Sequence, residues 1–166
     1  MKHIGNFAHL IDQRALEFVL SNTGEIRPSE KDKALKRQNN RDTVTRWEHA
    51  NYDISKLRWE SFTGEHFDWK VLLPFEGEVS WWFSKLMPGD IFPWHIDTYA
   101  TEGRKAKRYF MAYQDYQLGH VFVYEDKLLA PYKAGDVFEF HDDTVAHAAA
   151  NIGLIPKISL QLIVYQ

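Results

Sequence analysis

The second half of the chain divides into short apolar segments separated by turns, and this spacing limits the fold more than any other feature. The segments are rich in aromatic and β-branched residues, and Gly or Pro stands near most of their ends. Many short strands at such spacing are typical of a mainly β jelly-roll or cupin-like barrel. The predicted strands are 69–73, 79–86, 91–97, 109–113, 120–124, 137–140, 147–151 and 158–165.

The first part of the chain is predicted to support this barrel. Residues 12–21 have the apolar spacing of a short helix, and Asp12 can cap its N-terminus. Residues 22–46 are polar, so we expect a solvated loop or a short surface helix, with a mobile flap as the alternative. We therefore predict one domain over 1–166, in which 1–68 form one or two short helices and loops and 69–166 form the barrel.

Composition excludes several classes of protein. The 166 residues are 45% hydrophobic and 15% aromatic, enough to fill the core of one domain. The absence of cysteine excludes a disulfide scaffold, a thiolate metal site and a cysteine nucleophile. The net charge of −3 argues against bulk binding to nucleic acid. No stretch reads as a signal peptide or a membrane span, so we expect a cytoplasmic protein. We also expect a monomer or a small homo-oligomer.

The most informative motif is His95-Ile96-Asp97, at the end of a predicted strand. Residues at positions i and i+2 of a strand point to the same face, so this imidazole and this carboxylate can converge. His147 could supply a third ligand from another strand. Two histidines and one carboxylate form the facial triad of non-haem Fe(II) oxygenases, which leaves coordination positions open. His141 is a rival for the distal position, and we favour His147.

Downstream of His147, Lys157 follows after ten residues and Ser159 after twelve. With the His-x-Asp pair, this arrangement resembles the 2-oxoglutarate- and Fe(II)-dependent oxygenases, over roughly residue 81 to the C-terminus. The resemblance implies a double-stranded β-helix with His95, Asp97 and His147 as iron ligands. It further implies that Lys157, aided by the Ser159 hydroxyl, binds the distal carboxylate of 2-oxoglutarate. Fe(II), 2-oxoglutarate and O₂ are the cofactors and co-substrates so implied.

The stretch from Asp142-Asp143-Thr144 through His147 to Asn151 is similar to one branch of these enzymes, the aspartyl/asparaginyl β-hydroxylases. That branch has glycine at the position of Asp97, so this chain departs from it in keeping a full triad. The likeness suggests a peptide side chain as substrate, and a small molecule is the other option. Asp142 and Asp143 either orient the ligands or cap a turn.

Three functions follow from these residues. The first is a 2-oxoglutarate-dependent hydroxylase that converts 2-oxoglutarate to succinate. The second is a cupin-type metal enzyme that does not use 2-oxoglutarate, and the third is a non-catalytic β-barrel binding protein. Lys157 favours the first over the second. Around the site, the basic run 104–108 is either a solvated hairpin or a rim for an acidic substrate, and Arg108 or Tyr124 could reach the co-substrate.

Overall fold

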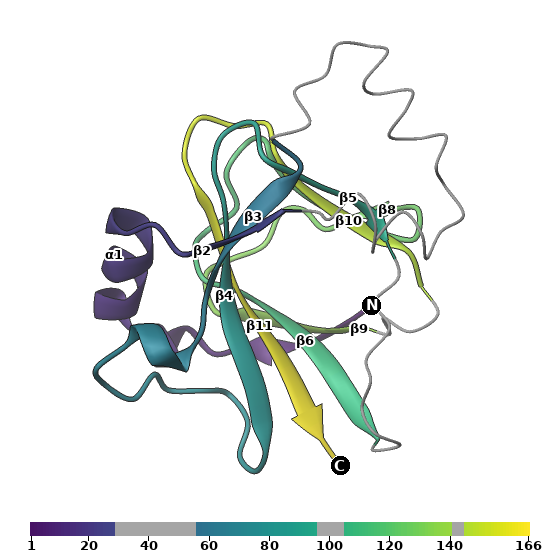
Figure 1. Cartoon of the computed structure of the whole chain (residues 1–166). Helices are drawn as coiled ribbons and strands as arrows, with labels where there is room; N and C mark the ends of the chain where they lie inside the picture. The colour runs from purple at the N-terminus through teal and green to yellow at the C-terminus, as the bar shows by residue number, and fades with distance from the viewer. Residues whose placement is uncertain (29–55, 96–104, 141–144) are drawn as a thin grey trace.

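Two antiparallel β-sheets face each other in the computed structural model, which describes residues 1–28, 56–95, 105–140 and 145–166 (Figure 1). The larger sheet has the strand order β1-β9-β6-β11-β4-β3-β2, and the smaller has the order β5-β10-β7-β8. The strands are β1 (Lys2–Asn6), β2 (Glu25–Pro28), β3 (Arg58–Phe62), β4 (Val79–Leu86), β5 (Ile91–His95), β6 (Ala106–Ala112), β7 (His120–Tyr124), β8 (Lys127–Leu128), β9 (Asp136–Phe140), β10 (His147–Asn151) and β11 (Lys157–Tyr165).

The chain passes back and forth between the two sheets from β4 onward. Strands β4, β6, β9 and β11 lie in the larger sheet, and β5, the β7–β8 hairpin and β10 lie between them in sequence but in the smaller sheet. This alternation is the topology of a double-stranded β-helix, a form of the jelly roll. The mainly β fold predicted from the sequence is therefore confirmed.

Strand β11 separates two hydrophobic cores. Ile158, Leu160 and Leu162 face a core on the outer side of the larger sheet. Lys157, Ser159 and Gln161 alternate with them and line a cavity between the two sheets. Because successive side chains of a strand point to opposite faces, one strand can serve both spaces. The second core, with Phe110, Phe122, Phe138 and Phe140 among its members, also lies between the sheets.

Helix α1 (Gln13–Ser21) covers the outer face of the larger sheet (Figure 1). The Asp12 side chain caps its N-terminus by accepting hydrogen bonds from the backbone of Arg14 and Ala15, as predicted. Asp12 also accepts a hydrogen bond of 2.7 Å from the indole of Trp69, which joins the helix start to the segment after β3.

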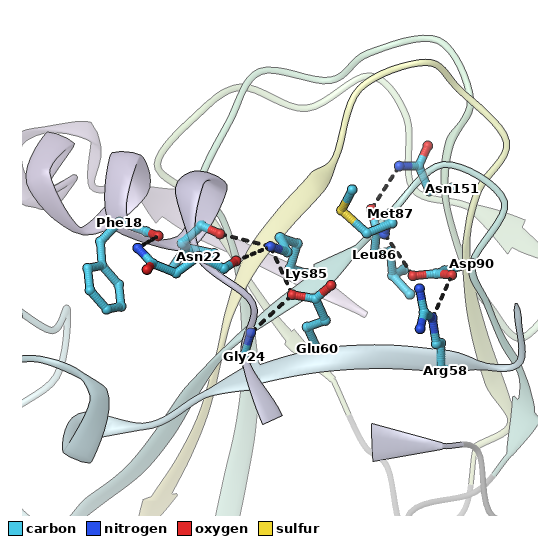
Figure 2. Close-up of polar contacts among 11 residues, drawn as sticks. Phe18, Asn22, Gly24, Arg58, Glu60, Lys85, Leu86, Met87, Asp90 and Asn151 are labelled. Carbon is cyan, nitrogen blue, oxygen red and sulfur yellow. Dashed lines mark hydrogen bonds and ion pairs between the residues drawn. The ribbon is translucent and has the colours of Figure 1, made fainter. Parts of the chain in front are cut away.

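Lys85 of β4 fastens the other end of the helix, as Figure 2 shows. Its ammonium donates hydrogen bonds to the carbonyls of Val19 and Asn22 and forms an ion pair of 2.8 Å with Glu60 of β3. Lys85 is 3% exposed and Glu60 is 5% exposed, so both charges are buried. A cation at the C-terminus of a helix also complements the helix dipole. This cluster ties α1 to the sheet.

Two parts of the sequence-based prediction are corrected by the structure. Residues 1–68 contain strands β1, β2 and β3 as well as the predicted helix, and β2 falls in the segment that was expected to be a loop. Residues 69–73, predicted as the first barrel strand, form no strand. A strand at 69–73 would have to pair with the free edge of β4, and β3 already pairs with that edge. Trp69 instead packs edge-on against Phe18 and Phe67 on the outer face.

Candidate functional site

The two predicted histidine ligands lie side by side in the smaller sheet. His95 ends β5 and His147 begins β10, and the two residues are directly paired across the antiparallel ladder. Paired residues present their side chains on the same face. The ring centroids are 4.1 Å apart, and the residues are only 4% and 3% exposed. Residues 52 positions apart in the sequence are thus brought together by strand register.

Hydrogen bonds to the backbone orient both imidazoles. His95 Nδ1 lies 2.7 Å from the carbonyl oxygen of Pro93, and His147 Nδ1 lies 3.3 Å from that of Val145. A carbonyl oxygen only accepts, so each Nδ1 carries a proton, and in the neutral imidazole Nε2 is left with the lone pair. Histidines that bind metals are commonly held in this way, with the second nitrogen donating to a carbonyl. The pair therefore fits a metal ion bound through Nε2.

The third predicted ligand, Asp97, lies outside the described residues. The same is true of the rival His141 and of Asp142 and Asp143. Within the described ranges, no group of three His, Cys, Asp or Glu side chains could hold a metal. The structure accordingly brings together two of the three predicted ligands, and the role of Asp97 stays a prediction.

A cavity of about 190 Å³ lies between the sheets, and His147 forms part of its wall. Lys157 and Ser159, the predicted carboxylate-binding residues, line the same cavity from β11. The described lining contains two cations, Lys157 and Arg108, and no carboxylate. Such a lining favours an anionic occupant. The remaining described lining residues are Trp59, Trp82, Ser84, Leu86, Phe92, Phe110, Phe122, Ala149 and Gln161.

Lys157 is an unusual residue for the interior of a barrel. It is 3% exposed, and its Nζ lies 5.5 Å from the ring centroid of Phe110 and 5.6 Å from that of Phe122. Burial lowers the pKa of its ammonium from 10.5 to about 7. A buried cation of this kind is costly without an anion beside it.

Two other polar residues of the cavity wall were only partly anticipated from the sequence. Gln161 donates a hydrogen bond of 3.0 Å to the Ser159 hydroxyl inside the cavity. Arg108 of β6, named from the sequence as a residue that could reach the co-substrate, lines the cavity and is 8% exposed. Tyr124, the other residue so named, packs in the core between the sheets. Gln161 was not named from the sequence. Its position between Leu160 and Leu162 is a signal that could have found it, because a polar residue that alternates with apolar residues in a strand lies on the opposite face.

Asn151, the last residue of the motif that contains His147, has a structural role. It is fully buried, and its amide donates a hydrogen bond of 2.8 Å to the carbonyl of Leu86 (Figure 2). The same amide donates a second hydrogen bond of 2.8 Å to the carbonyl of Ile155. Its side-chain oxygen accepts a hydrogen bond from the backbone of Gly153. Asn151 therefore joins the end of β4 to the loop before Lys157 and closes this end of the barrel.

The turn between β4 and β5 is held at the same end. Asp90 accepts hydrogen bonds from Arg58 and from the backbone of Met87, as Figure 2 shows. His120 of β7 hydrogen-bonds through Nε2 to the Ile155 carbonyl at 3.2 Å. Burial lowers the pKa of His120, and nearby Lys157 lowers it further, while the Ile155 contact opposes both. His120 thus serves as a neutral structural support for the loop before Lys157.

Comparison with solved structures finds cupin and double-stranded β-helix proteins of low sequence identity. A Cupin 2 conserved barrel domain protein from Salinispora arenicola is 14% identical, with a TM-score of 0.41, over 63% of this chain and 74% of that chain. A predicted oxalate decarboxylase from Thermotoga maritima is 24% identical, with a TM-score of 0.37, over 52% and 66%. A candidate sugar phosphate isomerase from Acidithiobacillus ferrooxidans is 13% identical, with a TM-score of 0.44, over 67% of this chain, which spans 61% of that protein.

These likenesses carry no argument about activity, because the TM-scores are below 0.5. No protein-family model matches the chain, and no curated protein matches it. Within the described ranges, no helix has the length and apolar character needed to cross a bilayer. The assignment of the fold rests on strand topology, and by that topology the chain is a cupin-like double-stranded β-helix.

Proposed function

We propose that the protein is a 2-oxoglutarate- and Fe(II)-dependent oxygenase that hydroxylates a C–H bond. One observation carries the proposal: the buried ammonium of Lys157 shares a cavity with His147, which is paired with His95. In the proposed reaction one oxygen atom of O₂ enters the C–H bond of the substrate. The other enters 2-oxoglutarate, which loses CO₂ and becomes succinate.

His95, His147 and the predicted Asp97 would hold the iron. When bound, Fe(II) supplies the activation of O₂, which is chemistry that no side chain of this protein can perform. The chain's contribution at this point is orientation, because the carbonyls of Pro93 and Val145 keep both imidazoles in the Nδ1-protonated form. Phe92, whose ring centroid lies 3.9 Å from that of His95, shields the pair from water.

Lys157 and Ser159 would bind the distal carboxylate of 2-oxoglutarate. The Ser159 oxygen already accepts a hydrogen bond from Gln161, so its own O–H can donate to an anion. An ammonium and a hydroxyl on one carboxylate form charge-assisted hydrogen bonds, which strengthen where water is excluded. The aromatic rings of Phe110 and Phe122 around Lys157 provide that exclusion.

Replacing His147 with alanine is expected to abolish iron binding. The change removes one of two adjacent imidazoles, whereas His141→Ala should leave binding largely intact. The measurement is an anaerobic titration with Fe(II) and 2-oxoglutarate, followed by the weak visible charge-transfer absorption of the complex. His9→Ala, at an exposed histidine, is the matched control.

The same titration separates the competing functions. Bound iron without the absorption band would indicate a cupin-type metal enzyme that does not use 2-oxoglutarate. Failure of the wild-type protein to bind iron at all would indicate a non-catalytic binding protein. Loss of iron binding in His141→Ala, with normal binding in His147→Ala, would mean that His141 and not His147 is the distal ligand.

Binding of 2-oxoglutarate is expected to take up a proton at about pH 8 and almost none at about pH 6. The reason is that Lys157, with a pKa of about 7, is largely neutral above that pH, and a bound carboxylate restores its charge. Calorimetry in buffers of different ionisation enthalpy measures the uptake. Lys157→Arg should remove it, because a guanidinium stays protonated. Equal uptake by this variant would assign the proton to another group.

A further inference from the structure

Three half-buried aromatic residues form one side of the cavity wall. Trp59 of β3, Trp82 of β4 and Phe92 of β5 all line the cavity, and each keeps part of its surface exposed. The ring centroids of Trp59 and Phe92 are 4.3 Å apart, so a ring of the larger sheet meets a ring of the smaller sheet there. We refer to these three residues as the aromatic wall.

Strand alternation explains why both indoles face the cavity. Glu60 of β3 and Lys85 of β4 are Cα partners, and their ion pair lies on the side of α1. Successive side chains of a strand point to opposite faces. Trp59, next to Glu60, therefore points toward the smaller sheet. Trp82 does the same, because it stands three positions before Lys85.

Gln161 adds a polar group beside the aromatic wall. Its Cα is paired with that of Trp82 across β4 and β11, and paired residues present their side chains on the same face. The amide nitrogen of Gln161 donates to the Ser159 hydroxyl, which leaves the amide oxygen at the other end of the group. No residue in the described part of the chain donates to that oxygen. An N–H group of a ligand can therefore do so.

Trp59 is the member of the wall on which a ligand ring is expected to make its main contact. Trp82 already has a cation against it, since Arg108 Cζ lies 5.4 Å from its ring centroid. Phe92 packs against His95, with 3.9 Å between the ring centroids. Trp59 in turn packs against Phe92, so a ring beside Trp59 lies close to the predicted metal ligands without contacting them directly.

We propose that the substrate enters the cavity as an uncharged aromatic ring, packed on Trp59, with an N–H group that donates to Gln161. The term substrate rests on the proposed function, but the ring site does not. Gln161 lies four positions beyond Lys157 on β11, which is roughly 13 Å of strand. The distal carboxylate of 2-oxoglutarate at Lys157 would thus leave the aromatic wall to the substrate.

The wall favours a flat ring over an aliphatic group of equal size. Aromatic pairs gain about two- to tenfold in affinity beyond the contact area alone, because the positive edge of one ring attracts the negative face of another. An uncharged ring also fits the co-substrate better than an anion, since an anion would compete for Lys157.

The test compares benzamide with cyclohexanecarboxamide, which carry the same amide on a flat and a saturated ring. Calorimetry on the full chain, with and without saturating 2-oxoglutarate, should show benzamide binding at least about threefold more tightly in both conditions. Trp59→Leu should abolish this preference and Trp59→Phe should keep it. Trp94→Leu, at an exposed tryptophan outside the described cavity wall, is the matched control and should behave as wild type.

A second comparison tests the hydrogen bond to Gln161. N,N-dimethylbenzamide has no N–H group, and we expect it to bind at least about threefold more weakly than benzamide to the wild type. Gln161→Leu, which removes the acceptor and keeps a similar volume, should bring the two affinities close together. A difference that is unchanged in Gln161→Leu would overturn the role of Gln161.

A third pair of probes identifies the source of the ring. Blocked tripeptides with central phenylalanine or central cyclohexylalanine, titrated in parallel, show whether a protein side chain can supply it. A preference for the flat ring in either the amide pair or the peptide pair supports the proposal. Absence of a preference in both pairs, including absence of binding, overturns it.

Two further results would overturn the proposal. The first is displacement of benzamide by 2-oxoglutarate, which would mean that both ligands bind at Lys157. The second is a ring preference that survives in Trp59→Leu. If Trp59→Leu does not fold, Phe92→Leu, which removes the ring behind Trp59, should weaken the preference instead. If 2-oxoglutarate fails to bind but the ring preference depends on Trp59, the proposed function fails and the ring site stands.

Discussion

Lys85→Met is expected to lower the free energy of unfolding by about 3–5 kcal/mol, the usual cost of removing one partner of a buried ion pair. The variant leaves Glu60, 5% exposed, without its cation. It also removes the donor for the carbonyls of Val19 and Asn22 at the end of α1. Methionine fills much of the same volume, so the loss reports charge and hydrogen bonding rather than a cavity.

Chemical denaturation with a fixed protein concentration measures this change. Lys107→Met is the control, because the Lys107–Glu139 pair is 3.4 Å long and partly exposed and should contribute less than about 1 kcal/mol. Replacing Glu60 with leucine as well should restore much of the lost stability, because no unpaired charge then remains. A loss no larger than that of the control would show that Lys85 does not fasten α1.

Lys157→Met is expected to have the opposite effect and to stabilise the protein. Burial lowers the pKa of Lys157 from 10.5 to about 7, and each pKa unit corresponds to about 1.4 kcal/mol, so the variant should gain about 3–5 kcal/mol below pH 7. The same change should abolish 2-oxoglutarate binding. Stability gained where binding is lost is the expected sign of a residue kept for function.

The pH dependence of this gain has a definite sign. Below about pH 7 Lys157 is charged in both the folded and the unfolded state, so the wild type bears the whole cost of burying the charge. As the pH rises from about 7 toward 10.5, the unfolded state holds the extra proton and the stability of the wild type rises. The difference between Lys157→Met and wild type should therefore shrink over this window.

Denaturation of both proteins over this pH range measures the difference directly, because groups other than Lys157 cancel. A gain that stays constant with pH would mean that packing, not charge, accounts for it. Lys133→Met, at an exposed lysine on the surface, should change stability little at any pH.

The barrel strands were predictable from the sequence because local signals define them. Strands β4 and β7 begin and end where the turn residues and the aromatic or β-branched segments placed them, and β10 also has its predicted bounds. The first three strands carry no such signal. Strand β1 pairs with β9, with Lys2 opposite Glu139, and β2 pairs with β3 across residues 29–55. Pairing over such separations is decided by tertiary structure, so residue 69 was wrongly taken as the start of the β structure.

The candidate site was predictable where residue type and spacing carried the chemistry. His95, His147, Lys157 and Ser159 were named from the sequence, and the structure brings His95 to His147 and places the other three around one cavity. The position of Trp59 in the cavity wall was not predictable, because it depends on β3 joining the larger sheet. Asn151 belongs to the motif by sequence, yet its hydrogen bonds give it a structural role.

One face of β11 packs in the outer core and the other lines the cavity, which limits how this protein can change during evolution. Deleting or inserting one residue between Lys157 and Tyr165 would exchange the faces of the strand beyond that point. Leu160 and Leu162 would then enter the cavity, and Ser159 and Gln161 would face the helix. Both the core and the site would be lost at once. We therefore expect homologues to differ from this strand by substitution and to keep its length.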